Sequence, residues 1–185
     1  MSFLPGKLRA EHAQDRWPND WYIETPASVH ALFDTVEFYG AIHDPACGAG
    51  NIPTIARLRG FMATGSDLVY RGFGSGDVNF LSDNTRRINI VTNPPYKIAE
   101  GFAAHAISVA ERKVAVVVRI SFLAGQKRRV SLFERHPSSV VVVLSTRPSM
   151  PPGGTDIPAK GGTADYCWIV WDSNHDGPTE IRWAA

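Results

Sequence analysis

At residues 88–96 the chain reads Ile-Asn-Ile-Val-Thr-Asn-Pro-Pro-Tyr, an apolar run that ends in a stiff turn. The run indicates a buried strand, and a helical pattern begins near Lys97. Two consecutive prolines remove two backbone donors, so the carbonyl between them points outward without an internal partner. Asn93 adds an amide oxygen and Tyr96 an aromatic face, which together could hold a flat ring bearing an amino group. An ordinary Pro-Pro turn after a strand is the alternative.

A glycine-rich turn precedes this stretch in the chain. A strand-like run leads into Asp44-Pro45-Ala46-Cys47-Gly48-Ala49-Gly50, and a helical pattern follows at residues 51–60. Gly48 and Gly50 let the backbone approach a ligand closely, and the helix start presents free N–H groups. The turn has neither the dinucleotide spacing nor the Lys-Ser/Thr pair of a phosphate loop. Because Asp44 would repel phosphate, a cationic or amine-bearing ligand fits better.

The two motifs together resemble the paired signature of S-adenosylmethionine-dependent adenine-N6 DNA methyltransferases of the Asn-Pro-Pro-Tyr type. The resemblance covers residues 21–171. Glutamine-N5 methyltransferases that act on release factors, and ribosomal RNA guanine-N2 methyltransferases, also carry Asn-Pro-Pro-Tyr, so the tetrapeptide leaves the substrate open. The chain looks like a phage or prophage type without a large target-recognition domain, and this departure puts sequence specificity in doubt.

The resemblance implies a role for each motif. Asn93, Pro94, Pro95 and Tyr96 would be the catalytic residues: a target adenine would stack on Tyr96 and donate hydrogen bonds to the Asn93 amide oxygen and the Pro94 carbonyl. An aromatic residue before a Thr-Pro pair would contact the methionine end of the cofactor. The implied cofactor-binding residues are Tyr22, Thr25, Pro26, Asp44, Pro45, Ala46, Cys47, Gly48, Gly50, Asp67, Leu68, Asp77, Phe80 and Asn93.

Some of these residues can also be interpreted from the sequence alone. Asp67 ends a predicted strand at 61–66, roughly 20 residues past the glycine turn, a spacing typical of a carboxylate that binds ribose hydroxyls. A solvated loop aspartate is the alternative. Thr25 and Pro26 form an N-cap and first-turn proline for a helix over about 26–37, which has an ordinary capped surface helix as its alternative. Asp77 follows a glycine-dense segment, where Gly-Asp also marks ordinary turns.

The second half of the chain predicts further strands. The β-branched run at 114–120 indicates a central strand, and the basic residues 126–129 open a helix that either meets phosphates or faces solvent. Valine-rich residues 139–145 and the apolar run 165–171 predict a hairpin whose long Pro/Gly loop is disordered or functional. In the resembled family this loop lines the target-base pocket. The tail around Arg182 predicts an edge strand.

These patterns predict one α/β domain at 21–185 after an N-terminal arm at 1–20. We expect a Rossmann-like class I methyltransferase fold: a mostly parallel seven-stranded sheet with helices on both faces and a C-terminal antiparallel hairpin. Hydrophobic residues make up 44% and charged residues 20% of the 185 residues, an ordinary globular composition without a membrane-spanning stretch. Two cysteines in different settings and no metal-ligand cluster predict a cytoplasmic protein without metal.

The expected function is transfer of a methyl group from S-adenosylmethionine to the N6 amino group of adenine in DNA, either single-stranded or read with weak sequence specificity. Two alternatives remain: methylation of RNA purines or a protein glutamine, and a catalytically silent accessory subunit that binds S-adenosylmethionine. The net charge of +1 neither requires nor excludes nucleic acid, because a local basic patch suffices. No membrane partner is expected, and the oligomeric state is left open.

Overall fold

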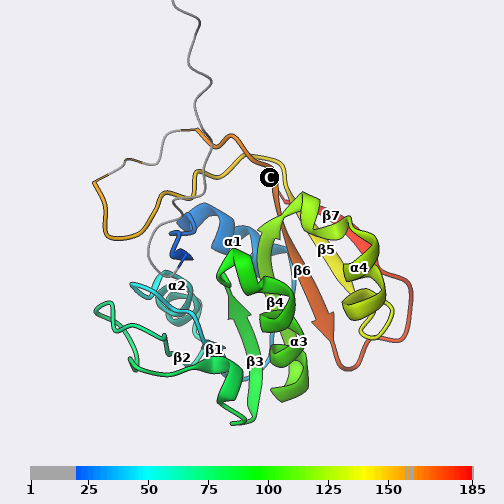
Figure 1. The fold of residues 1–185 in the computed structure, drawn as a ribbon, viewed down its shortest axis with the longest axis horizontal. Coiled ribbons are helices and arrows are strands. Elements are labelled where there is room, and N and C mark those ends of the chain that lie inside the picture. Colours follow the sequence, from blue (N-terminus) through cyan, green and yellow to red (C-terminus); the bar gives the residue numbers. More distant parts are fainter. Residues whose placement is uncertain (1–19, 157, 159–160, 185) are drawn as a thin grey trace, which may run out of the picture.

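A seven-stranded sheet runs through the molecule in the computed structural model, which describes residues 20–156, 158 and 161–184 (Figure 1). The predicted arm at 1–20 lies outside the described residues except for Asp20. Neighbouring strands follow the order β2-β1-β3-β4-β6-β5-β7. The strands are β1 (Ile42–Asp44), β2 (Ala63–Gly65), β3 (Arg87–Thr92), β4 (Ala110–Arg119), β5 (Val140–Leu144), β6 (Tyr166–Asp172) and β7 (Glu180–Ala184).

One strand of the sheet runs against the others. β6 is antiparallel to both β4 and β5 and lies between them, whereas the pairs β1/β2, β1/β3, β3/β4 and β5/β7 are parallel. The predicted seven-stranded, mostly parallel sheet with a C-terminal antiparallel hairpin is thereby confirmed. The tail forms the predicted edge strand, β7, with Ile181 and Trp183 exposed.

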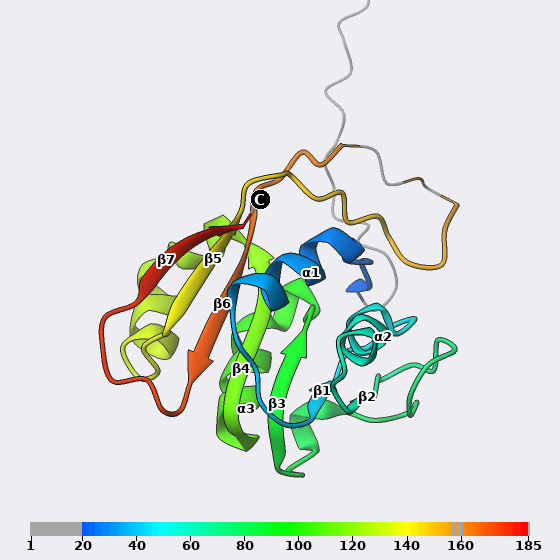
Figure 2. The same ribbon diagram turned by 180° about the vertical axis from the view of Figure 1, so that it is seen from behind.

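Helices cover both faces of the sheet. α1 (Pro26–Thr35) and α2 (Asn51–Leu58) lie on one face (Figure 2), while α3 (Ala99–Val109) and the short α4 (Gln126–Arg128) lie on the other (Figure 1). A π-helical turn, η5 (Arg129–Phe133), continues α4. Side chains alternate along β4, so that Ala115 and Val117 join the core under α1 and α2 while Val116 and Val118 join the core under α3.

The helix ends follow local chemistry. Thr25 caps α1, because its Oγ1 accepts a hydrogen bond from Ser28 N at 3.2 Å, and Pro26 opens the first turn. α1 ends at Thr35, slightly before the predicted boundary, where Val36 turns to extended backbone. Single turns of tight helix occur at η2 (Phe80–Ser82), η3 (Tyr96–Ile98) and η4 (Ile120–Leu123).

The carboxyl ends of the parallel strands β1, β2, β3 and β4 share one edge of the sheet. The long connection between β5 and β6 crosses this same end of the molecule (Figure 1). Open α/β sheets bind ligands at this edge. Across the described ranges, none of the helices has the length and apolar character needed to cross a bilayer.

Candidate active site

The Asn93 side chain lies at the carboxyl end of β3, 8% exposed. Its Nδ2 donates to the Tyr22 carbonyl at 2.8 Å and to Glu24 Oε2 at 3.1 Å. Two acceptors on one side of the amide fix its orientation. The amide oxygen Oδ1 therefore points the other way, and within the described part of the chain this buried atom has no hydrogen-bond partner.

The prolines and Tyr96 complete this turn. No described residue donates to the Pro94 carbonyl, whereas the Pro95 carbonyl accepts from Ile98 N at 3.1 Å. The Tyr96 ring stacks on Tyr22 with centroids 5.2 Å apart and planes inclined by 17°. Burial, and then the neighbouring Tyr166, raise the pKa of Tyr96 far above its ordinary value. Tyr96 therefore stays neutral and offers an aromatic platform, one face of which Tyr22 covers.

The glycine-rich turn lies beside this site, between β1 and α2. Gly48 and Gly50 have φ of +51° and +90°, a left-handed conformation that favours glycine. Gly48 N donates to Asp67 Oδ2 at 2.8 Å, and Val69 N donates to the other carboxylate oxygen at 3.1 Å. The structure therefore places the Asp67 carboxylate at the glycine turn, and its role toward ribose hydroxyls stays a prediction.

Three carboxylates gather around the turn. Burial, followed by the charge of Glu24, raises the pKa of Asp44 well above its ordinary value. Burial likewise raises the pKa of Glu24. The negative charge of Asp67 also raises the pKa of Asp44. Asp67 lies 3.9 Å from Arg71 Nε, whereas Glu24 and Asp44 are buried without an ion pair among the described residues. Buried carboxylates are costly without a cation beside them, so these two groups fit a positively charged ligand.

Glu24 and two aromatic residues at this site were not found from the sequence. Glu24 orients Asn93, and its only signal was an acidic residue just before the Thr-Pro pair. Trp21 and Phe73 cover the glycine turn: an added Cβ at Gly48 would lie 2.5 Å from Trp21 Nε1, and one at Gly50 would lie 2.3 Å from Phe73 Cγ. The bicyclic indole is close to a purine in size, and it lies against the glycine backbone.

Trp21 belongs to a strap, defined as residues 20–25, that the loop after β5 holds in place. Ile23 N donates to the Pro151 carbonyl at 2.9 Å, and Gly153 N donates to the Trp21 carbonyl at 3.0 Å. The guanidinium of Arg71 stacks on the indole at 4.1 Å. The strap therefore lies over both the glycine turn and Tyr96, and a nucleoside can reach the turn only when Trp21 and Phe73 shift.

The remaining predicted residues lie in more varied settings. Pro45 is buried and Ala46 is half-buried beside the glycine turn, while Leu68 is 56% exposed next to Asp67. Phe80 is buried against Phe102 and His105 on the α3 face, and Asp77 is exposed at a φ of +56°. The described structure thus gathers Tyr22, Asp44, Gly48, Gly50, Asp67 and Asn93 closely, and it engages the Phe80 ring in the core.

Cys47 follows Ala46 in the turn, where it is buried. Burial, and then the negative charge of Asp44, raise the pKa of its thiol to about 12. The thiol is therefore protonated at neutral pH and is not a nucleophile. Cys47 and Cys167 are both free. Within the described ranges no cluster of His, Cys, Asp and Glu has the arrangement of a metal site.

No family model and no curated protein matches the chain. Solved structures do match its fold. A modification subunit assigned to a type I restriction enzyme from Vibrio vulnificus aligns with a TM-score of 0.58 at 16% identity, over 85% of this chain and 45% of that one. A predicted O-methyltransferase from Agrobacterium tumefaciens aligns with a TM-score of 0.59 at 13% identity, over 88% and 86% of the two chains.

A third structure, magnesium protoporphyrin IX methyltransferase from Synechocystis with bound SAH, aligns with a TM-score of 0.51 at 12% identity, over 78% of each chain. The chain spans less than half the length of the Vibrio protein. Together with the strand order, these likenesses define the class: the chain has the Rossmann-like fold of class I methyltransferases.

Proposed function

We propose that this protein is an S-adenosylmethionine-dependent methyltransferase that acts on the N6 amino group of adenine in DNA, in the cytoplasm. The observation that carries the proposal is the Asn93 amide oxygen, buried and without a partner at the carboxyl end of β3. A buried acceptor of this kind is costly unless a donor reaches it. The amino group of a target base is such a donor.

The residues at the glycine turn fit the cofactor. Asp67 would accept hydrogen bonds from ribose hydroxyls, while Asp44 and Glu24 lie close enough to favour the positive charge of the sulfonium and amino groups. Gly48 and Gly50 leave a cradle that Trp21 and Phe73 now fill. S-adenosylmethionine, when bound, supplies a methyl group activated by the positive sulfur.

The chain's own groups would then prepare the adenine. The amino lone pair of adenine is delocalised into the ring and is a poor nucleophile. Hydrogen bonds to Asn93 Oδ1 and to the Pro94 carbonyl favour a tetrahedral nitrogen whose lone pair points out of the ring plane. Tyr96 holds the ring by stacking, once Tyr22 gives up that face or the base takes the other. Alignment of the reacting atoms supplies much of the remaining acceleration.

The direct test compares substrates and variants in one assay. Transfer of a tritiated methyl group should occur to DNA and should be lower by about 100-fold or more in Asn93→Ala, the effect of removing one such electrostatic contact. Binding of S-adenosylhomocysteine should change little in this variant. If the wild-type protein methylates RNA or protein but not DNA, the proposed substrate is wrong. Full activity of Asn93→Ala would refute the role of the turn.

One observation favours the second candidate, a silent accessory subunit that binds the cofactor. Trp21 and Phe73 pack on the glycine turn, and a catalytic role requires both rings to move. Cofactor binding without transfer to DNA, RNA or protein would support this candidate. Release of methylated adenine after digestion of the DNA product would exclude it.

A further inference from the structure

A cavity of about 210 Å³ opens beside the Asn-Pro-Pro-Tyr turn, on the α3 side. Its walls include both rings of the Tyr22/Tyr96 stack, the end of β4 at Arg119, and Ser121 and Arg128 beyond it. The cavity therefore combines an aromatic platform with two guanidinium groups. The adenine proposal uses only the platform and leaves the positive charges without a role.

The two arginines differ in what already holds them. Arg128 donates to the Phe122 carbonyl at 2.6 Å and the Ala124 carbonyl at 2.9 Å, and its Nε lies 3.6 Å from a carboxylate oxygen of Glu100. Arg128 thus anchors the turn after β4. Arg119 is exposed, and no carboxylate in the described ranges pairs with it. Its charge is therefore available to a ligand.

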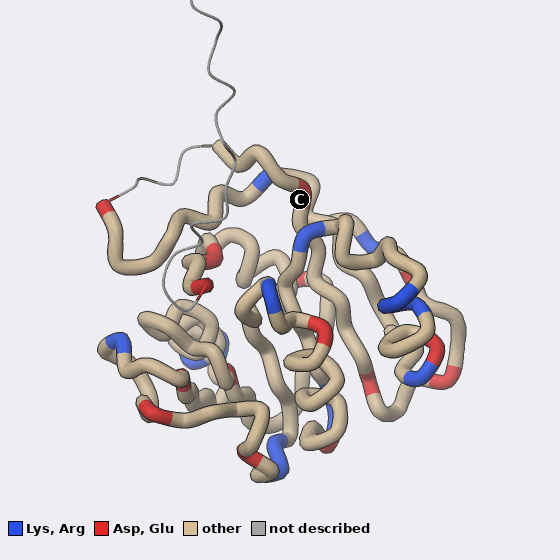
Figure 3. The backbone as a smooth tube through the Cα atoms, in the orientation of Figure 1, with Lys and Arg blue, Asp and Glu red and all other residues tan. Residues whose placement is uncertain are grey.

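Arg119 also faces a second cavity, of about 200 Å³, under the loop between β5 and β6. Ser149, Gly162 and Tyr166 line this cavity with it. Hydrogen bonding to the Tyr166 hydroxyl raises the pKa of Arg119, and Arg119 lines both cavities. Lys and Arg positions lie along this end of the molecule, at the top of β4 and on α4 (Figure 3).

Building on the proposed function, we propose that Arg119 binds a phosphodiester next to the target nucleotide. The base would occupy the Tyr96 cavity and the neighbouring nucleotide would occupy the cavity under the loop. A guanidinium matches the geometry of two phosphate oxygens, and its charge releases counterions from the nucleic acid backbone. A peptide substrate has no group for this position, so Arg119 would favour a polynucleotide over a protein glutamine.

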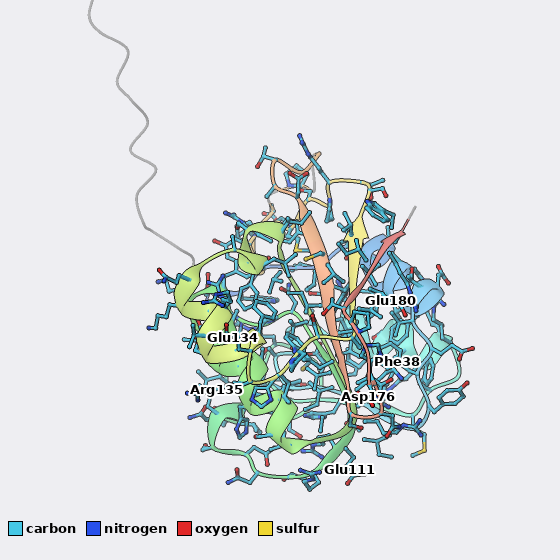
Figure 4. The ribbon with its side chains drawn as sticks, turned by 90° about the vertical axis from the view of Figure 1, so that its right-hand side faces the viewer. Phe38, Glu111, Glu134, Arg135, Asp176 and Glu180 are labelled. Atoms are coloured by element: carbon cyan, nitrogen blue, oxygen red, sulfur yellow. The ribbon has the colours of Figure 1, made fainter. Side chains whose placement is uncertain are left out.

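The test measures binding of fluorescent single-stranded DNA and RNA oligonucleotides, each with one adenine, over a series of salt concentrations. In Arg119→Gln the slope of log affinity against log salt should fall by about 1, with affinity about tenfold lower at low salt. Arg119→Lys should recover part of the affinity. Arg135→Gln is the matched control, because this exposed arginine lies next to Glu134 on the outer surface, before β5 and away from the carboxyl ends of the strands (Figure 4).

A neutral methylphosphonate beside the adenine sharpens the test. The wild type should lose affinity for this oligonucleotide, whereas Arg119→Gln should bind it as well as the charged one. The proposal is overturned if Arg119→Gln keeps the wild-type salt slope, or if Arg135→Gln lowers it equally. If RNA binds more tightly than DNA, the phosphate site stands and the substrate is RNA instead of DNA. If methyl groups are transferred to DNA but Arg119→Gln keeps the wild-type affinity and salt slope, this inference is overturned and the proposed function stands.

Discussion

Gly48 shows how one backbone position shapes the site. Its φ of +51° is a left-handed conformation, and an added Cβ would meet Trp21 Nε1 at 2.5 Å. Gly60 has φ of +88° with nothing within 4 Å of an added Cβ. A side chain at either position would strain the backbone, but only the one at Gly48 would also meet neighbouring atoms, so the two form a matched pair for mutation.

We expect Gly60→Ala to lower the free energy of unfolding by about 1–2 kcal/mol, the cost of left-handed backbone for alanine. Gly48→Ala should lower the free energy of unfolding further, because the Trp21 indole must move. It should also weaken S-adenosylhomocysteine binding by about tenfold or more, or ~1.4 kcal/mol. Urea unfolding and calorimetric titration measure both effects. Equal stability losses with unchanged binding would contradict the role of Gly48 in the cradle.

Glu24 makes stability depend on pH. Its raised pKa means that the folded carboxyl holds its proton more tightly than the unfolded one. Its contribution to stability is therefore full below the ordinary value of 4.5 and is lost as pH rises through the raised pKa. We expect Glu24→Gln to gain stability relative to the wild type as pH rises above 4.5, measured by urea unfolding at several pH values. A difference that stays constant with pH would contradict this.

At the scale of residues, the sequence was sufficient for turns that are built from consecutive residues. The glycine turn and the Asn-Pro-Pro-Tyr turn could be predicted because prolines and glycines set backbone shape locally. Glu24, Trp21 and Arg119 could not be assigned, because the partners that define them lie far away in the chain. The roles of Asp77 and Phe80 stay predictions, with the Phe80 ring held in the core.

At the scale of elements, α1 depends on its cap. Thr25 Oγ1 accepts from Ser28 N, and Ser28 Oγ in turn donates to the Thr25 carbonyl at 2.7 Å. Thr25→Ala should lower the free energy of unfolding by about 1 kcal/mol, whereas Thr25→Ser should retain most of the stabilisation that the hydroxyl cap provides. Urea unfolding of the three proteins measures this difference. A serine variant as unstable as the alanine variant would show that the methyl group, and not the hydroxyl, matters here.

Long apolar elements could be predicted and short ones could not. Residues 114–118 of β4 and 166–171 of β6 are buried on both faces, so these parts of the two strands are continuous apolar runs. The π-helical turn at η5 leaves no such pattern, since it depends on how Leu132 packs into the core under α3.

At the scale of the whole molecule, the strap couples the two halves of the site. Tyr22 covers Tyr96 and Trp21 covers Gly48, and the loop after β5 holds both through backbone hydrogen bonds. A ligand that displaces Trp21 must also disturb the Tyr22 stack. The cofactor at the glycine turn and the target base at Tyr96 should therefore increase each other's affinity.

Removing the cover should make the cradle accessible. We expect Trp21→Ala to bind S-adenosylhomocysteine several-fold more tightly, because less of the binding free energy is spent on opening the site. Trp21→Phe should behave nearly as the wild type. Trp183→Ala is the control, since this tryptophan is exposed on the far edge strand β7. Calorimetric titration measures the affinities, and weaker binding by Trp21→Ala would instead make the indole a wall of the site.

The position of β6 has a consequence for how the chain is made. Ribosomal synthesis delivers β4 and β5 well before the strand that separates them, so neither can gain its inner neighbour until residues up to 172 have emerged. Until then the nascent sheet has two unpaired inner edges rich in valine. Closure of the sheet is therefore a late event in synthesis, and the two edges stay open to pairing with other chains until it occurs.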